Sequence, residues 1–246
     1  NKKRIFETFF YQSLRTPAGE EPIIFPFYEE KNIGKIINDN TIFTNSFGIL
    51  NLFNKNKKYT RINHSFSIKY NIHKKGLIFQ NLGKILSTVY NIRDNNNNKK
   101  TNYLEIVPLI STTISYPLFK KSNKKNTEYL IPKLQLNYSP NKLSSSNINQ
   151  DSEEIGLDRT SLFATNRYSG KDFQEKGLWL NSGIKYENRS INGRKFGSEI
   201  GQIFRFDNIN QFSSNSGLNG NNSDLLISSF FDYKNFFSLK NISLLT

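Results

Sequence analysis

The chain has 246 residues, of which 36% are hydrophobic and 14% aromatic, and its formal net charge at pH 7 is +14. It contains no cysteine, which excludes disulfides and thiolate metal sites within this sequence, and it contains no run of about 18 apolar residues that could form a membrane helix. The 21 Phe and 12 Tyr are too many for a disordered chain. Aromatic residues in a polar background are typical of strands with one polar face, as in a β-sandwich or a membrane barrel.

The positive charge has two possible explanations. It could mark a surface that binds nucleic acid or another polyanion, or it could reflect a genome that favours Asn, Lys and Ile. The lysines lie in turns such as 54–58 and 120–125 rather than along one face, and the basic stretch FKKSNKK at 119–125 lacks the interleaved aromatics that stack on bases. We favour the compositional explanation and expect no nucleic-acid partner.

The sequence pattern predicts less regular structure for the N-terminal part of the chain than for the part that follows. The first 35 residues alternate poorly between apolar and polar positions and contain Pro17, Pro22 and Pro26, so we expect them to include a long loop. Alternation is weak at 41–53 and clear at 59–72, where the even positions are mostly apolar and the odd positions polar. Because successive side chains leave a strand on opposite sides, 59–72 predicts a strand with one apolar and one polar face.

The same alternation recurs to the end of the chain. It is clear at 104–118, 130–138, 178–187 and 196–206, and weaker at 84–93 and 225–235. These segments are longer than the five or six residues of an ordinary strand and match the roughly nine to eleven residues of a tilted membrane strand. Tyrosines lie at or near the ends of the apolar faces, as in the aromatic girdles of membrane barrels: Tyr70, Tyr116, Tyr138 and Tyr186. A soluble sandwich with long strands remains the alternative.

The connections between these segments also alternate in length. They are compact at 73–76 and 188–194, and long and polar at 93–101, 139–173 and 208–223, as in outer-membrane barrels. The sequence therefore predicts an all-β, antiparallel transmembrane β-barrel in the bacterial outer membrane. We expect residues 1–246 to form part of one barrel domain and to supply about eight to ten strands of a larger barrel.

No motif predicts catalysis or metal binding. His64 and His73 are the only histidines and are far apart in the sequence, and neither a G-x-S-x-G elbow nor a phosphate-binding glycine loop is present. The acidic residues between 151 and 158 do not have the spacing of an EF-hand. We therefore expect no enzymatic activity, no metal and no cofactor.

Three blocks carry a resemblance to a known family. They are FFYQSLR (9–15) with EPIIFPFYEE (21–30), LEIVPLISTTISYPLF (104–119) with YLIPKLQLNYSP (129–140), and the stretch 149–187. The third is the most specific, with Asn149, Asp151, Ser152, Asp158, Leu162, Phe163, Asn166, Arg167, Tyr168, Gly170, Asp172, Glu175 and Gly177 in order. Over residues 9 to 207 the chain resembles the C-terminal barrel of the LptD (OstA) family of outer-membrane proteins that assemble lipopolysaccharide.

The resemblance implies a function without covalent chemistry. Members of this family move lipopolysaccharide from a periplasmic bridge to the outer leaflet, so the implied partners are lipopolysaccharide, a lipoprotein plug (LptE-like) and a periplasmic bridge protein (LptA-like). A general outer-membrane porin and a soluble glycan-binding β-sandwich are the alternatives. A requirement for detergent and a heat-dependent change in gel mobility would separate a barrel from the sandwich, and ion conductance would indicate a porin.

The resemblance also implies that the loop at about 140–173 folds over or into the barrel. We expect Arg167 and Asp172 to form ion pairs or to bond the backbone, Gly170 to permit a turn that larger residues resist, and Leu162, Phe163 and Tyr168 to pack as an anchor. The alternative is a mobile surface loop. The candidate loop residues are Asp151, Ser152, Asp158, Phe163, Asn166, Arg167, Tyr168, Gly170 and Asp172.

Basic residues on the polar strand faces are candidates for the lumen of the barrel. They are Arg61, Lys69, Lys133, Lys185 and Arg205, and they could bind phosphorylated sugars through charge-assisted hydrogen bonds; hydration and packing of the lumen would explain them equally well. The chain contains no Met and ends within an apolar run, so we expect it to be part of a longer protein. Because a partial barrel leaves strand edges unpaired, we also expect the isolated chain not to fold stably.

Overall fold

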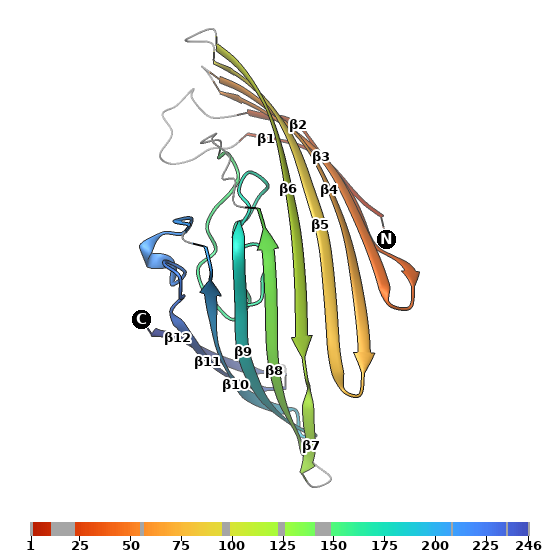
Figure 1. Cartoon of the computed structure of the whole chain (residues 1–246), viewed down its shortest axis with the longest axis vertical. Coiled ribbons are helices and arrows are strands. Elements are labelled where there is room, and N and C mark those ends of the chain that lie inside the picture. The colour runs from red at the N-terminus through yellow and green to blue at the C-terminus, as the bar shows by residue number, and fades with distance from the viewer. Residues whose placement is uncertain are drawn as a thin grey trace. The chain divides into compact units, whose positions relative to one another are not determined.

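The described residues fold mainly into antiparallel β-strands (Figure 1). A computed structural model describes residues 2–10, 23–54, 57–94, 99–122, 126–140, 149–207, 209–234 and 236–245. These residues contain twelve strands and one 3-10 turn, η1 (Ser214–Ser216). The strands are β1 (Lys2–Phe10), β2 (Ile23–Asn38), β3 (Thr41–Asn54), β4 (Lys57–Lys74), β5 (Leu77–Asp94), β6 (Lys99–Ser115), β7 (Leu118–Ser122), β8 (Asn126–Ser139), β9 (Gly177–Ser190), β10 (Arg194–Arg205), β11 (Leu225–Tyr233) and β12 (Phe237–Leu245).

Consecutive strands are neighbours in the sheet, except that β6 and β7 both pair with β8. The order is β1-β2-β3-β4-β5-β6-β8-β9-β10-β11-β12, and β7 pairs with β8 off this path. Within the described residues, no helix is long and apolar enough to cross a membrane. The chain divides into two compact units, the first comprising Asn1–Tyr70 and Leu82–Pro108 and the second Asn71–Asn81 and Leu109–Thr246.

The predicted fold class is confirmed, but the expected eight to ten strands were too few. Strands β1 and β2 occupy 2–10 and 23–38, where the sequence alternates poorly, and β12 was not predicted. The register between β2 and β3 shifts between Ile24 and Phe27 and again between Asn32 and Lys35. Each irregularity interrupts the two-residue period, so β2 lacks a clean alternating pattern. The loop expected in the first 35 residues falls on 11–22, outside the described residues.

The buried face of the sheet is the polar one. On β4, in the first unit, Arg61 and Asn63 are buried while Ile62 is 40% exposed. On β8, in the second unit, Gln135 is 6% exposed and Leu134 is 46% exposed. A soluble protein buries its apolar residues instead. This inverted alternation on strands of 12 to 18 residues, such as β4, β5 and β10, is the pattern of a membrane barrel, whose apolar face meets lipid.

The connections of the second unit differ in length at its two ends. Three residues join β9 to β10, and Gly193 in this Asn-Gly turn has φ +79°, a conformation that glycine adopts readily. The described residues between β11 and β12, Lys234 and Phe236, lie at the same end of the strands, which we call the short-turn end. The β8–β9 and β10–β11 connections, described at 149–176, 206–207 and 209–224, begin and end at the opposite end of the strands. We call the polar face of β8–β11 the inner face and the opposite face the outward face.

Candidate functional site

Two irregular segments pack on the inner face of the second unit, 149–176 from the β8–β9 connection and 209–224 from the β10–β11 connection. The predicted loop at about 140–173 corresponds to the first of them, although residues 141–148 lie outside the described part of the chain. The second segment is joined to β10 by backbone hydrogen bonds, such as that from the Ser223 N–H to the Ile203 carbonyl at 2.9 Å. Together we call 149–176 and 209–224 the inner module.

Side chains near the start of 149–176 hold the two ends of this segment together. Oδ1 of Asp151 accepts hydrogen bonds from the backbone N–H groups of Lys171 and Asp172, at 3.0 and 3.2 Å. Oγ of Ser152 accepts from the N–H groups of Asp172 and Phe173, and Oδ2 of Asp172 accepts from the Gln150 N–H at 2.7 Å. These bonds close the segment on itself, so it is a folded structure rather than an extended connection.

Gly170 makes this closure possible. Its φ is +67°, in the left-handed region, and a Cβ at this position would overlap the backbone carbonyl and the carboxylate of Asp151. A larger residue would therefore be strained by its conformation and would also collide with the group that closes the loop.

Asp158 organises a tight turn in the middle of the segment. Its Oδ1 accepts hydrogen bonds from the N–H groups of Thr160 and Ser161, both at 2.6 Å, and from the Thr160 hydroxyl at 2.8 Å. Burial alone would raise the pKa of Asp158, but the hydrogen bonds from Ser161 and Thr160 outweigh it and hold this pKa below its ordinary value. The turn directs the next two residues, Leu162 and Phe163, toward the sheet.

Leu162 and Phe163 rest on two glycines of the sheet. Gly183 on β9 and Gly201 on β10 are directly opposite each other in the register. A Cβ on Gly201 would overlap Cδ2 of Leu162, and a Cβ on Gly183 would lie 3.1 Å from Cζ of Phe163. Nζ of Lys133 lies 4.1 Å from the centre of the Phe163 ring. The glycines therefore form a recess in the sheet that receives the anchor of the module.

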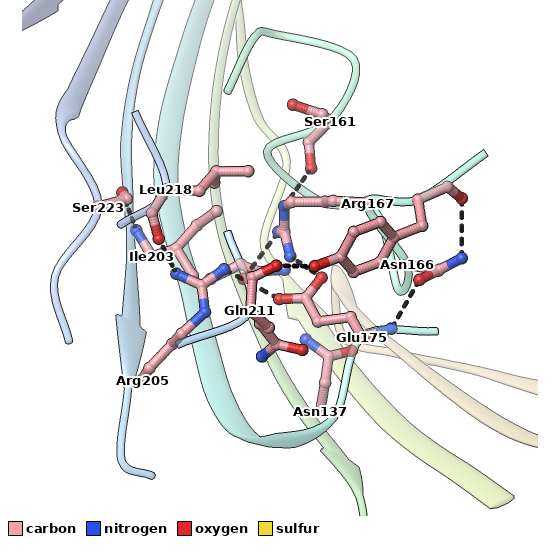
Figure 2. Close-up of polar contacts among 12 residues, drawn as sticks. Asn137, Ser161, Asn166, Arg167, Glu175, Ile203, Arg205, Gln211, Leu218 and Ser223 are labelled. Atoms are coloured by element: carbon pink, nitrogen blue, oxygen red, sulfur yellow. Dashed lines mark hydrogen bonds and ion pairs between the residues drawn. The ribbon is translucent and has the colours of Figure 1, made fainter. Parts of the chain in front are cut away.

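A buried ion-pair network connects the module to the sheet (Figure 2). The guanidinium of Arg167 donates to Oε2 of Glu175 at 2.7 Å, to Oδ1 of Asn181 on β9 at 3.2 Å, and to the carbonyls of Ser161 and Leu162 at 3.1 and 2.9 Å. Burial lowers the pKa of Arg167, and the neighbouring Glu175 carboxylate opposes this shift. A fully buried charge is tolerated only when it is paired and hydrogen-bonded in this way.

Glu175 bridges two arginines from different segments. Its Oε1 accepts from Arg205 on β10 at 2.9 Å, and Arg205 also donates to the carbonyl of Leu218 at 3.0 Å. The side chains of Arg167 and Glu175 are both 0% exposed, and that of Arg205 is 4% exposed. This Arg167–Glu175–Arg205 triad therefore links 149–176, β10 and 209–224, as Figure 2 shows.

Aromatic stacking and reciprocal hydrogen bonds join the two parts of the module. The ring of Tyr168 stacks on Phe212, with centroids 5.2 Å apart and planes 7° apart, and the Tyr168 hydroxyl donates to the Gln211 carbonyl. Burial raises the pKa of Tyr168. The side chain of Gln211 bonds both the N–H and the carbonyl of Lys176, at 3.0 and 2.8 Å. The module is therefore one packed body.

Asn166 completes the network from within the loop. Its Oδ1 accepts from the Glu175 N–H at 2.8 Å, and its Nδ2 donates to the Tyr168 carbonyl at 2.9 Å. The structure thus brings all nine loop residues named from the sequence into one packed module. The sequence interpretation missed three contributors: Glu175 as the partner of Arg167, the segment 209–224, and the glycine recess. Glycines inside strands, which mark close backbone approach, were the signal for the recess.

The five basic lumen candidates differ in their surroundings. Arg61 is buried and Lys69 half-buried on β4, in the first unit. In the second unit Lys133 covers Phe163, and Arg205 is enclosed in the triad. Lys185 belongs to a separate group of charges nearer the short-turn end.

This group surrounds the buried carboxylate of Glu187. Nζ of Lys185 lies 2.7 Å from Oε2, Nζ of Lys195 lies 3.6 Å from Oε1, and the Arg189 guanidinium also pairs with Oε1. The Lys185, Arg189 and Lys195 side chains are 27%, 57% and 39% exposed. Three cations share one carboxylate here, so this part of the inner face keeps a positive excess that solvent reaches.

An aromatic ring and a further arginine extend the group. Arg159 pairs with Glu199 at 3.2 Å, and its guanidinium carbon lies 4.4 Å from the centre of the Phe230 ring. Nζ of Lys195 lies 5.5 Å from the same ring. We call Arg159, Lys185, Arg189 and Lys195 the inner cationic area. Its chemistry suits anionic groups, and the described residues contain no His/Cys/Asp/Glu group that could hold a metal.

Comparison with known proteins adds one finding. The sequence model of the family described as "LptD: LPS transport system D" matches residues 16–242, which include the whole inner module and the inner cationic area. A search of curated proteins found no match.

Proposed function

Because this chain belongs to the LptD family of LPS transport proteins, we propose that it forms part of an outer-membrane β-barrel that delivers lipopolysaccharide to the outer leaflet. One observation carries the proposal beyond family membership. The strands bury polar side chains on one face and leave large apolar side chains exposed on the other, as with Gln135 and Leu134 on β8. Lipid against the outward face and a hydrated path along the inner face account for this pattern.

The inner face suits the saccharide part of the substrate. Sugars and their phosphates need hydrogen bonds and positive charge, and the inner cationic area offers both at solvent-exposed side chains. Lys133 extends this area on β8, and Arg61 and Lys69 contribute to the polar face of the first unit. Arg205 has a different role in this proposal. Its ion pair with Glu175 fixes the module, and the Arg205 side chain is enclosed there.

The inner module acts as a fixed filling of part of the barrel. The Arg167–Glu175–Arg205 triad and the packing of Leu162 and Phe163 in the glycine recess attach it to β9 and β10. The Tyr168–Phe212 stack holds its two segments together. A module held in this way narrows the hydrated path next to it and keeps that path constant in shape. The nine loop residues Asp151, Ser152, Asp158, Phe163, Asn166, Arg167, Tyr168, Gly170 and Asp172 serve this purpose.

The remaining parts of the proposal follow from the family. Residues 1–246 contribute to one barrel domain in the bacterial outer membrane, and the protein works with a lipoprotein plug (LptE-like) and a periplasmic bridge protein (LptA-like). Transport through such a barrel makes and breaks no covalent bond, so the protein needs no catalytic residue.

Depletion of the protein in its host cell tests the proposal. We expect surface lipopolysaccharide, measured by antibody binding to intact cells, to fall while total lipopolysaccharide in the cell stays constant. Complementation with the wild-type gene should restore the surface signal. Unchanged surface lipopolysaccharide after depletion, together with ion conductance of the purified protein in planar bilayers, would favour a general porin instead.

A further inference from the structure

A polar hollow lies at the short-turn end of the second unit. Its volume is about 420 Å³, and the β9–β10 turn and the end of β11 line it. Arg194 and Tyr233 are direct partners in the register between β10 and β11. Arg194 leaves β10 on the same side as Phe196, two residues further on, which is 44% exposed. The hollow therefore opens on the outward face, away from the inner module. Its lining residues are Ile191, Asn192, Gly193, Arg194, Tyr233 and Lys234.

Two cations lie near one tyrosine ring in this hollow. The guanidinium carbon of Arg194 lies 5.8 Å from the centre of the Tyr233 ring, and Nζ of Lys234 lies 5.6 Å from the same centre. Both basic side chains are exposed. A guanidinium, an ammonium and a phenol hydroxyl supply several hydrogen-bond donors and two positive charges in one place, which is the donor set that phosphate groups prefer.

The backbone of the two turns fixes this arrangement. The Lys234 N–H donates to the Gly193 carbonyl at 2.8 Å. A Cβ on Gly193 would lie 2.7 Å from Cγ of Lys234, and Gly193 has φ +79°. Only glycine at this position leaves the Lys234 stem where it is. The contacts between the turns therefore fix the backbone and the start of the Lys234 side chain, while its ammonium group stays exposed.

The surface next to the hollow is apolar and aromatic. Phe231 and Phe237 are 36% and 51% exposed, with ring centroids 6.4 Å apart. Tyr233 pairs with Phe237 in the register between β11 and β12, and Phe196 pairs with Phe231 between β10 and β11. Cations and a tyrosine at the edge of an exposed apolar face are typical of the boundary between water and a bilayer.

We propose that this hollow binds the phosphate headgroup of an anionic phospholipid, whose acyl chains lie along Phe196, Phe231 and Phe237. A phosphorylated molecule without acyl chains would use the cations but would leave the adjacent aromatic face uncovered. Short turns of outer-membrane barrels face the periplasm, so the lipid belongs to the periplasmic leaflet. The inference depends on the membrane-spanning orientation in the proposed function but not on the transport of lipopolysaccharide.

Lipid binding to the whole purified protein tests the inference. The protein is delipidated in mild detergent and titrated with phosphatidylglycerol or phosphatidylcholine, and bound lipid is counted by native mass spectrometry. We expect Arg194→Gln with Lys234→Gln to weaken phosphatidylglycerol binding about tenfold or more. The matched control is Lys120→Gln with Lys121→Gln on β7, which removes the same charge at the same end of the strands and should leave binding unchanged.

A second variant separates the shape of the hollow from its charge. Gly193→Val keeps both cations but displaces Lys234, and it should also weaken phosphatidylglycerol binding, with the heat-dependent gel shift as the check on folding. The inference is wrong if the control pair loses as much lipid as the Arg194/Lys234 pair, or if phosphatidylcholine binds as tightly as phosphatidylglycerol. Equal competition by soluble glycerophosphate or a phosphorylated saccharide would overturn the assignment to a lipid. Surface lipopolysaccharide, measured separately, reports on the proposed function.

Discussion

Leu162 of the inner module occupies the space that Gly201 of β10 leaves by having no side chain: a Cβ on Gly201 would overlap Cδ2 of Leu162. Gly183, the direct partner of Gly201 on β9, receives Phe163 in the same way. The sheet and the module are therefore complementary at the level of single methyl groups. Close packing of this kind leaves little room for an added atom.

Gly201→Ala should detach or shift the anchor of the module. The added methyl overpacks the recess and should destabilise the protein by roughly 1–3 kcal/mol, which would lower the temperature at which heated protein shifts in gel mobility. The matched control is Gly83→Ala on β5, because nothing lies within 4 Å of a Cβ at Gly83. If Gly201→Ala and Gly83→Ala shifted in gel mobility at the same temperature, the recess would not contribute to stability as proposed.

Glu175→Ala should be the most damaging single change in the module. It leaves Arg167 and Arg205 without their shared carboxylate in a buried site, and breaking a buried ion pair costs about 3–5 kcal/mol. We expect faster trypsin cleavage at Arg159 and Lys171, measured by mass spectrometry of the fragments. Glu153→Gln, at an exposed position of the same segment, is the control. A cleavage rate like that of the wild type would show that the triad is not needed to hold the loop.

The alternation of side chains made the fold class predictable from the sequence. Ile62 and Asn63 show why. These neighbours lie on opposite faces of β4 in different surroundings, so apolar and polar residues alternate along the sequence. Strands β1 and β2 could not be predicted in the same way. The bulges around Ile24–Phe27 and Asn32–Lys35 change the face of the residues that follow, and no local residue pattern fixes where such a shift occurs.

Only the features of the candidate site that depend on residues close together in the sequence were predictable. The turn at Asp158 and the glycine at position 170 have recognisable local signals. The pairing of Glu175 with Arg205 is different, since it joins residues 30 positions apart through the packing of the inner module on β10. The contact between Tyr168 and Phe212 depends on the same packing. Long-range contacts of this kind are set by the tertiary structure rather than by any short stretch of sequence.

Acid should weaken the turn at Asp158. The pKa of this group is lower in the folded protein than its ordinary value of about 3.9. Its contribution to stability is therefore fully present above that ordinary value and is lost as the pH falls through the folded value. At pH 6 we expect the gel-mobility shift to occur at a higher temperature for the wild type than for Asp158→Asn. Near pH 3 the difference between these two temperatures should be smaller. A difference that is constant between these pH values would contradict the assignment.

Chemical labelling of neighbouring residues tests which face of the sheet meets lipid. The chain contains no cysteine, so single cysteines can be placed at Leu134 and Leu136 on the outward face of β8, and at Gln135 and Asn137 on the inner face, without background from this sequence. The outward pair should react with a maleimide that partitions into the bilayer. The inner pair should be spared, because its side chains are buried on the polar face. The reverse pattern would invert the two faces and remove the basis for a lumen lined by the inner cationic area.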